Sequence, residues 1–122
     1  MTEDQPPSLD FIAGLINKCG VFMWVKQKAL EVPVFQVKME LEERILLEMI
    51  KAKLGLQEKI YEYKYKDKSF LLLLIRRRSV IESTIIGVFD GKFWGKKKIQ
   101  FDAWKNKFYE KKLEFVYKHH NN

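Results

Sequence analysis

The sequence predicts an α+β domain in which helices cover one face of a four-stranded antiparallel sheet. Its 122 residues, 47% of them apolar, suit one domain with a real core. Along the chain the apolar residues change from helical spacing to alternation and back. The resulting order is helix, two strands, helix, two strands and two helices. Consecutive hairpins in that order favour an antiparallel sheet with the helices packed on one face.

The first helix is predicted between Ser8, which can cap its N-terminus, and Gly20, which can end it. A strand rich in valine and aromatic residues follows over residues 20–29. Residues 34–41 alternate between polar and apolar side chains, which is typical of a half-buried strand.

The second helix is predicted over residues 42–54. It begins with acidic residues and ends with lysines, an order that suits the helix macrodipole, and Gly55 is placed to close it. Its apolar stripe is expected to consist of Leu46, Met49, Ile50 and Leu54. Two more strands follow over residues 57–66 and 68–76, joined by a tight turn at residues 66–68.

Two helices are predicted in the last third of the chain. Ser79 can cap a short helix that reaches Phe89, and Asp90-Gly91 is typical of a turn. A long helix then begins near Lys96. Its expected buried side chains, at helical spacing, are Phe101, Trp104, Phe108 and Phe115.

We expect an N-terminal extension over residues 1–8, a single domain over 9–118 and a disordered tail over 119–122. The single cysteine excludes an internal disulfide and a cysteine-based zinc cluster. The acidic N-terminus is unlike a signal or transit peptide, and no apolar run is long enough to span a membrane. Because 19 of the 23 basic residues are lysines, as in proteins from AT-rich genomes, we expect a prokaryotic cytoplasm or an organelle (mitochondrion or plastid) that encodes the protein itself, with no cleaved targeting signal.

The positive charge is concentrated at the C-terminal end. Residues 1–90 carry 14 basic and 13 acidic groups, whereas residues 91–122 carry 9 basic and 3 acidic groups. This asymmetry predicts a polyanionic partner. The alternative is a solvated lysine face that serves only solubility. The basic surface is expected to include Lys92, Lys96, Lys97, Lys98, Lys105, Lys107, Lys111 and Lys112.

The stretch Ile12-Ala13-Gly14-Leu15-Ile16-Asn17-Lys18-Cys19-Gly20 resembles the nine-residue signature of the LAGLIDADG homing endonucleases. Further segments in the same order resemble later parts of that family's domain: residues 33–37, 54–55 with 60–61, 85–89 and 96–101. The resemblance covers nearly the whole chain and implies the family's αββαββα fold.

The resemblance also implies that the signature helix packs closely against a second such helix. With one signature per chain, this means a homodimer or pairing with another protein. Glycine inside a helix costs about 1 kcal/mol relative to alanine, so Gly14 needs a reason, and close backbone approach supplies one. The alternative is a core helix with a tolerated glycine. The helix-packing interface is expected to comprise Ile12, Ala13, Gly14 and Ile16.

The end of the signature departs from the family pattern. Family enzymes hold a divalent metal on an acidic residue at the eighth position, which here is Cys19, and the sixth position is Asn17. A neutral thiol is a poor ligand for Mg²⁺, and Lys18 adds positive charge. We therefore expect no catalytic residues, no metal and no cofactor. A soft metal on Cys19 is the alternative, but one thiolate lacks the further ligands that such a site needs.

The resemblance places the exposed face of the sheet against nucleic acid. The first strand presents Val21, Met23, Val25 and Gln27 there, and the fourth strand is apolar on both faces. This surface is poorly suited to reading duplex bases, whereas lysine beside tyrosines suits stacking on unpaired bases. A register slip would exchange the faces, and cross-strand packing is the alternative role for the tyrosines. The predicted nucleic-acid-binding residues are Gln36, Lys38, Lys59, Tyr61, Tyr63, Tyr65, Arg76, Arg77, Arg78, Lys96, Lys97 and Lys98.

These observations favour a catalytically inactive, repurposed protein that binds structured RNA, either ribosomal RNA in a ribosome or an intron RNA. DNA is the alternative nucleic acid. One competing hypothesis is an active DNA endonuclease with an unorthodox metal ligand. Another is a protein-interaction subunit that pairs with a LAGLIDADG paralogue, which the apolar strands favour.

Overall fold

The computed structural model describes residues 6–120, with side chains through residue 114. It confirms an α+β domain with one antiparallel sheet of order β1-β2-β4-β3. The strands are β1 (Gly20–Gln27), β2 (Leu30–Met39), β3 (Ile60–Tyr65) and β4 (Lys68–Ile75). The helical elements are α1 (Leu9–Cys19), η1 (Leu41–Glu43), α2 (Arg44–Lys53), α3 (Arg78–Val80), η2 (Ile81–Ile86), α4 (Gly87–Phe89) and α5 (Gly95–His120).

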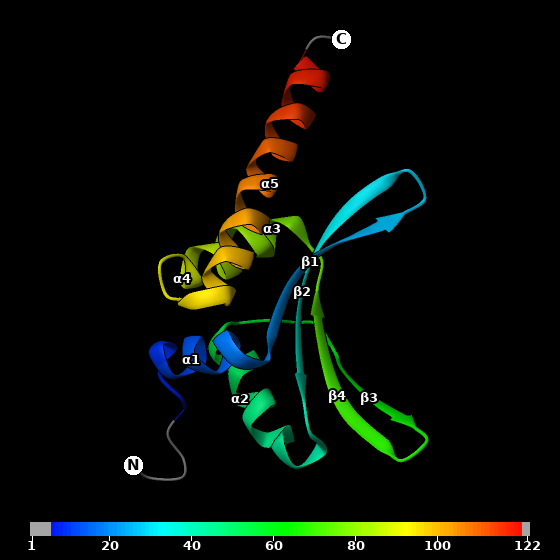
Figure 1. Cartoon of the computed structure of the whole chain (residues 1–122), viewed down its shortest axis with the longest axis vertical. Helices are drawn as coiled ribbons and strands as arrows, with labels where there is room; N and C mark the ends of the chain where they lie inside the picture. Colours follow the sequence, from blue (N-terminus) through cyan, green and yellow to red (C-terminus); the bar gives the residue numbers. More distant parts are fainter. Residues whose placement is uncertain (1–5, 121–122) are drawn as a thin grey trace.

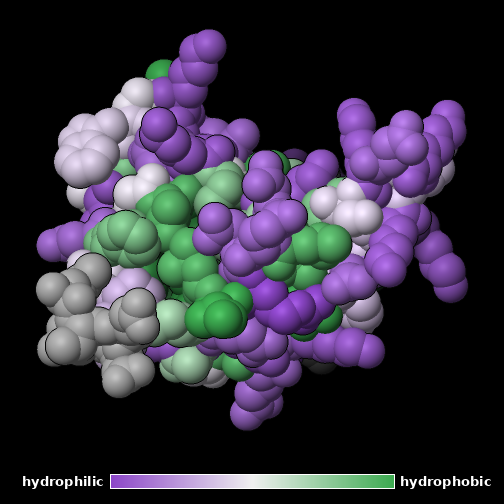
Figure 2. All heavy atoms as spheres, turned by 90° about the horizontal axis from the view of Figure 1, so that it is seen from below, coloured by the Kyte–Doolittle hydropathy of each residue, from purple (hydrophilic) through white to green (hydrophobic). Residues whose placement is uncertain are grey.

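The helices all lie on one side of the sheet, and the other side is uncovered (Figure 1). The β1–β2 and β3–β4 hairpins point to opposite ends of the sheet, and both curve away from the helices. Seen from below, apolar surface gathers on the helical side, while polar side chains project around the β3–β4 hairpin (Figure 2). No helix in the described part of the chain is long and apolar enough to cross a membrane.

The first helix begins as predicted, because the Ser8 hydroxyl accepts a hydrogen bond of 3.1 Å from the backbone N–H of Phe11. The predicted helix over 42–54 is divided into the 3₁₀ turn η1 and the helix α2. A 3₁₀ turn advances three residues per turn, so the buried stripe shifts. Leu47 is buried in place of the predicted Leu46 and Met49, which are only half-buried.

Ser79 is not the cap that the sequence predicted. Arg77 occupies the N-cap position of α3 and makes no side-chain capping bond. The backbone carbonyl of Ser79 instead accepts a 2.7 Å hydrogen bond from the Ser83 hydroxyl. Residues 78–89 form one helical run whose middle, η2, is a π-helix.

The centre of the core is the aromatic ring of Phe22 on β1. Its centroid lies 5.0 Å from both the Phe101 ring and the Trp104 ring of α5, and 5.1 Å from the ring of Phe35 on β2. The Trp104 indole also donates a 3.0 Å hydrogen bond to the carbonyl of Met23. This contact confirms that Phe101 and Trp104 bury the last helix against the sheet.

The long last helix begins at Gly95 and continues to His120. Phe108 is buried as predicted, whereas the side chain of Phe115 lies outside the described residues. The helix includes residues 119 and 120, which were predicted to belong to a disordered tail. Residues 1–5 and 121–122 are outside the described part of the chain.

Candidate nucleic-acid interface

The uncovered face of the sheet has the register that the sequence predicted for β1. Phe22 points into the core, and its neighbours Val21 and Met23 lie on the opposite face, where they are half-buried. In the ladder Val21 is opposite Gln36, and Met23 is opposite Val34. The half of the face that belongs to β1 and the adjoining part of β2 is therefore mostly apolar.

Strand β4 is apolar on both faces, as predicted. Leu71, Leu73 and Ile75 are fully buried on the core side. Leu72 and Leu74 lie on the uncovered side and are half-buried, opposite Lys38 and Gln36 of β2. These two polar residues are the only ones that β2 contributes between Val34 and Met39 on this face.

An aromatic row follows the β3–β4 hairpin. The side chains of Tyr61, Tyr63 and Tyr65 are 46%, 44% and 66% exposed. The Tyr63 ring stacks on Phe70 across the ladder, with centroids 5.4 Å apart, so cross-strand packing accounts for this tyrosine in part. The Lys59 ammonium lies 5.7 Å from the centroid of the Tyr61 ring, which places positive charge beside the row.

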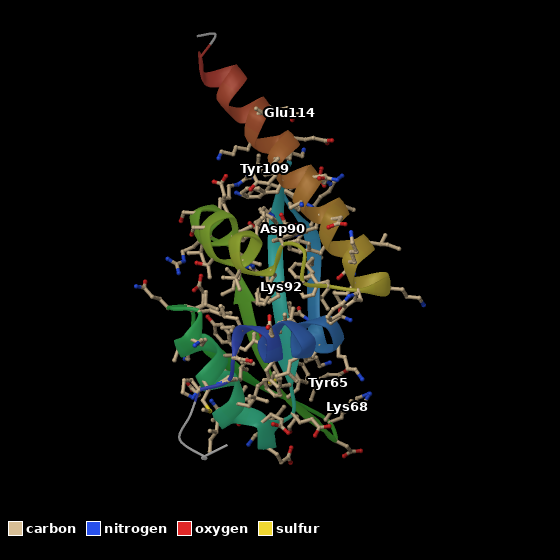
Figure 3. The ribbon with its side chains drawn as sticks, turned by 90° about the vertical axis from the view of Figure 1, so that its left-hand side faces the viewer. Tyr65, Lys68, Asp90, Lys92, Tyr109 and Glu114 are labelled. Atoms are coloured by element: carbon tan, nitrogen blue, oxygen red, sulfur yellow. The ribbon has the colours of Figure 1, made fainter. Side chains whose placement is uncertain are left out.

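Both hairpin tips carry lysines that are not among the predicted nucleic-acid-binding residues. Lys28 and Lys66 occupy the turns with positive φ, at 60° and 53°. Lys68 pairs with Tyr65 beside the second turn, and Figure 3 shows both residues at the lower end of the molecule. These lysines could have been predicted from the sequence as contacts to a partner, because the tip is the most exposed part of a hairpin.

The three arginines after β4 have different environments. Arg77 makes two hydrogen bonds to the Glu58 carboxylate, at 2.8 and 2.9 Å. Hydrogen bonding to Arg77 lowers the pKa of Glu58 below its ordinary value of 4.5. Arg77 is therefore largely neutralised within the fold, whereas Arg76 and Arg78 are exposed and make no ion pair with a described residue.

The basic C-terminal region is not the open positive surface that the sequence predicted. Lys105 pairs with Asp90 at 2.8 Å, and Lys112 with Glu82 at 2.6 Å. Glu31 of β2 lies between two lysines of α5 and forms ion pairs with both, Lys107 and Lys111. Much of this charge thus attaches α5 to acidic groups elsewhere in the chain.

The three consecutive lysines at the start of α5 also separate. Lys97 reaches the end of α1 and donates hydrogen bonds to the Gly20 carbonyl and to Gln100 Oε1. Lys98 pairs with Asp102 at 2.6 Å. Lys96 is exposed and has no hydrogen-bond or ion-pair partner among the described side chains. Of these three lysines, only Lys96 is therefore fully available to a phosphate.

The end of the signature helix is closed by hydrogen bonds within the fold. The Cys19 thiol donates a 3.1 Å bond to the Leu15 carbonyl, and burial raises the pKa of Cys19 above its ordinary value of 9.0. The side-chain oxygen of Asn17 accepts a 2.9 Å bond from the backbone N–H of Trp94. Burial also lowers the pKa of Lys97. Within residues 6–114 no three His, Cys, Asp or Glu side chains are grouped to hold a metal ion.

The predicted helix-packing interface requires correction. Ile12, Ala13 and Ile16 lie in the core of this chain, because they form the apolar side of α1 that faces the sheet. Of the four predicted residues only Gly14 is exposed, on the side of α1 that also carries Phe11, which is 49% exposed. A Cβ atom added to Gly14 would meet nothing within 4 Å, so no contact inside the described chain requires glycine there.

Comparison with known proteins gives a structural match but no sequence match. No protein-family model and no curated protein matches the chain. It is similar to the meganuclease I-SmaMI bound to uncleaveable DNA, with a TM-score of 0.77 and 19% identity over 93% of this chain and 40% of that one. It is also similar to the I-LtrWI LAGLIDADG homing endonuclease bound to target DNA (TM-score 0.77, 23% identity, 87% of this chain and 38% of that one).

A third match, the homing endonuclease I-TnaI, has a TM-score of 0.77 and 14% identity and covers 90% of this chain and 77% of that one. The chain therefore spans about 40% of the length of most of these structures, and it spans most of I-TnaI. These matches confirm the fold that the signature implied: the chain has a single LAGLIDADG-like domain.

Proposed function

We propose that this chain, whose fold is that of a LAGLIDADG domain, is a catalytically inactive protein that binds nucleic acid. Its target is structured RNA, either ribosomal RNA in a ribosome or an intron RNA. It acts in a prokaryotic cytoplasm or in an organelle that encodes it. The I-SmaMI and I-LtrWI structures with the same fold are bound to DNA, so DNA is the alternative target that the experiments must distinguish.

The end of α1 is the observation that carries the inactivity. The resemblance assigns a metal-binding carboxylate to the position of Cys19, and a divalent hard cation requires oxygen ligands. The Cys19 thiol instead donates to a helix carbonyl, and its raised pKa keeps it protonated at neutral pH. These residues do not fit the metal, so they cannot lower the pKa of an attacking water as the family's site would.

The exposed aromatic row supports RNA as the target. Duplex DNA is read by side chains that donate to or accept from base edges, and one half of the sheet face offers mainly valine, leucine and methionine. The other half offers Tyr61, Tyr63 and Tyr65 beside lysines. Such a surface suits the stacking of unpaired bases, which are common in structured RNA and rare in duplex DNA.

A metal-binding measurement tests the inactivity. Titration of the wild-type chain with Mn²⁺ should reveal no saturable site, and the chain should cut no DNA in its presence. A double variant, Asn17→Asp with Cys19→Asp, restores both carboxylates and should bind Mn²⁺. Saturable Mn²⁺ binding together with DNA cleavage by the wild-type chain would refute the proposal and establish an active endonuclease.

A co-purification experiment tests the target. The protein is recovered from its native cells at moderate salt, and both the bound RNA and the bound DNA are sequenced. Enrichment of ribosomal RNA with co-sedimentation alongside ribosomal particles supports a structural role, and enrichment of one intron supports a maturase-like role. Recovery of DNA without RNA would contradict the RNA assignment.

Pairing through α1 is a second candidate role, and Gly14 is the observation that favours it. Gly14, on the exposed side of its helix, has a propensity cost that no contact among the described residues offsets. Close approach of a second helix would offset that cost, in a homodimer or with a LAGLIDADG paralogue. Sedimentation equilibrium of the wild-type chain against Gly14→Leu tests this role, because position 14 is exposed in the free chain and a leucine side chain would block close approach.

A further inference from the structure

A groove opens where β2 leaves the sheet. After Met39 the chain turns into η1, whereas the β3–β4 hairpin continues, so the edge of β4 has no β2 neighbour from Lys68 to Phe70. The space between them is lined by residues 38–42 and 67–70 and has a volume of about 710 Å³. That volume is within the range of sites that hold a small molecule or a single nucleotide.

The groove presents an aromatic ring and positive charge together. The ring of Phe70 lines it, and the Lys38 ammonium lies 4.2 Å from the ring centroid. Phe70 also stacks on Tyr63, so the groove is the end of the exposed aromatic row. A base and its phosphate require a flat apolar surface with a nearby cation. A base that stacks on Phe70 takes the place of the Lys38 ammonium over the ring, and the displaced ammonium is then beside the phosphate.

The groove also contains carboxylates, which are unusual on a surface that binds phosphates. Five charged side chains line it: Lys38, Glu40, Glu42, Asp67 and Lys68. None of them forms an ion pair with any described side chain, although the lysines of α5 repeatedly do so with other acidic residues. Unpaired carboxylates beside unpaired ammonium groups fit a ligand that carries both hydrogen-bond donors and negative charge.

We propose that this groove holds one unpaired guanine of the bound RNA, with the base against Phe70 and its Watson–Crick edge on the Glu40 carboxylate. Guanine presents two adjacent donors on that edge, N1–H and the N2 amino group, which match the two oxygens of a carboxylate. Adenine and cytosine place an acceptor beside their amino donor, and uracil has acceptors on both sides of its single donor. A carboxylate repels each of those arrangements.

The backbone after β2 selects Glu40 among the three carboxylates. Glu40 keeps an extended backbone, with φ at −72° and ψ at 158°, so the alternation of side chains continues past Met39 and puts Glu40 on the same face as Lys38, in the lining that also contains Phe70. Lys38 and Lys68 flank it and would bind the phosphates on either side of the base. This inference rests on the proposed RNA binding and adds a base preference to it.

Fluorescence anisotropy with labelled octanucleotides tests the inference. The probes are an all-uridine RNA, the same RNA with one central guanosine and the same RNA with inosine, which lacks the N2 amino group. The wild-type chain should bind the guanosine probe about tenfold more tightly than the uridine probe. Inosine should lose most of that gain.

Two variants localise the effect. Glu40→Gln should abolish the preference for guanosine while leaving the affinity for the uridine probe unchanged or higher. Glu43→Gln, which removes the same charge from an exposed neighbour outside the groove, is the matched control and should retain the preference. A thermal unfolding curve for each variant shows that the fold is intact.

The outcomes separate the inference from the proposed function. Equal binding of all three probes would overturn the guanine site and leave RNA binding standing. A guanosine preference that survives Glu40→Gln would also overturn the assignment. Absence of binding to all three probes, and to longer structured RNA, would overturn the proposed function and the inference with it.

Discussion

The two hairpins of the sheet are similar in construction but are held in different ways. The base of the β1–β2 hairpin is held by α5, although its tip is exposed: the Trp104 indole bonds to the Met23 carbonyl, and Glu31 forms ion pairs with Lys107 and Lys111. Residues 61–69 of the β3–β4 hairpin are all exposed. The difference shows which groups stabilise the fold and which are left for a ligand, a distinction that net charge alone does not make.

The strongest way to break this comparison is to remove the core of the β1–β2 hairpin. Phe22→Ala should lower the free energy of unfolding by about 3–5 kcal/mol, because it deletes the ring around which the other aromatic residues pack. Urea denaturation measures the loss. A loss below about 1 kcal/mol would mean that the surrounding rings fill the space left by Phe22. That result would contradict the central place of this buried ring in the core.

In the exposed β3–β4 hairpin, a substitution should weaken binding and leave stability unchanged. Tyr65→Ala should weaken RNA binding by about 1–3 kcal/mol if one base stacks on this ring, and should leave the unfolding midpoint unchanged. Tyr109→Ala is the matched control, since this tyrosine of α5 is also exposed but lies on the helical side. Equal losses for both variants would show that the binding surface is not the sheet.

Gly14 tests whether the helical side also has a surface reserved for a partner. Gly14→Ala should stabilise the isolated chain by up to about 1 kcal/mol, because no described atom lies within 4 Å of the added methyl group and alanine favours the helix. Thermal unfolding at low protein concentration measures this gain. If Gly14 contacts a second helix, the same variant should dissociate at higher concentrations than wild type in analytical ultracentrifugation.

The smallest expected effect concerns the ion pair between Arg77 and Glu58, at the base of the β3–β4 hairpin. The folded-state pKa of Glu58 is lowered, so its contribution to stability is complete above pH 4.5 and is lost as the pH falls through the lowered pKa. Glu58→Gln should therefore make the free energy of unfolding fall less steeply than in the wild type as the pH drops from 5 to 2. Near pH 7 the free energies of unfolding of the two proteins should depend on pH in nearly the same way. An unchanged acid limb would contradict the ion pair.

Patterns of short range were predictable from the sequence. The alternation in β2, the cap at Ser8 and the helical spacing of Phe101, Trp104 and Phe108 gave elements and faces that the structure confirms. The buried residues of α2 differ from the predicted ones because the 3₁₀ turn η1 changes which side chains face the core. The prediction had assumed α-helical spacing over the whole segment.

The candidate site was less predictable, because its properties depend on pairs far apart in the chain. Lys107 is 76 residues from Glu31, and Lys97 is 77 residues from Gly20. No local pattern shows that these lysines are already paired, so the C-terminal charge was assigned to a partner. The lysines at the hairpin turns and the groove beside Glu40 were missed for the same reason, since both arise from how the strands end.

The strand order also governs how this domain folds. Each hairpin pairs neighbouring strands and can form early, whereas the central β2–β4 ladder joins Met39 to Leu71 and Phe35 to Ile75. Closing that long loop is the costly event, so we expect the docking of two preformed hairpins to set the folding rate. Substitutions that weaken either hairpin tip should then slow folding more than they speed unfolding, because the hairpins are already formed when they dock.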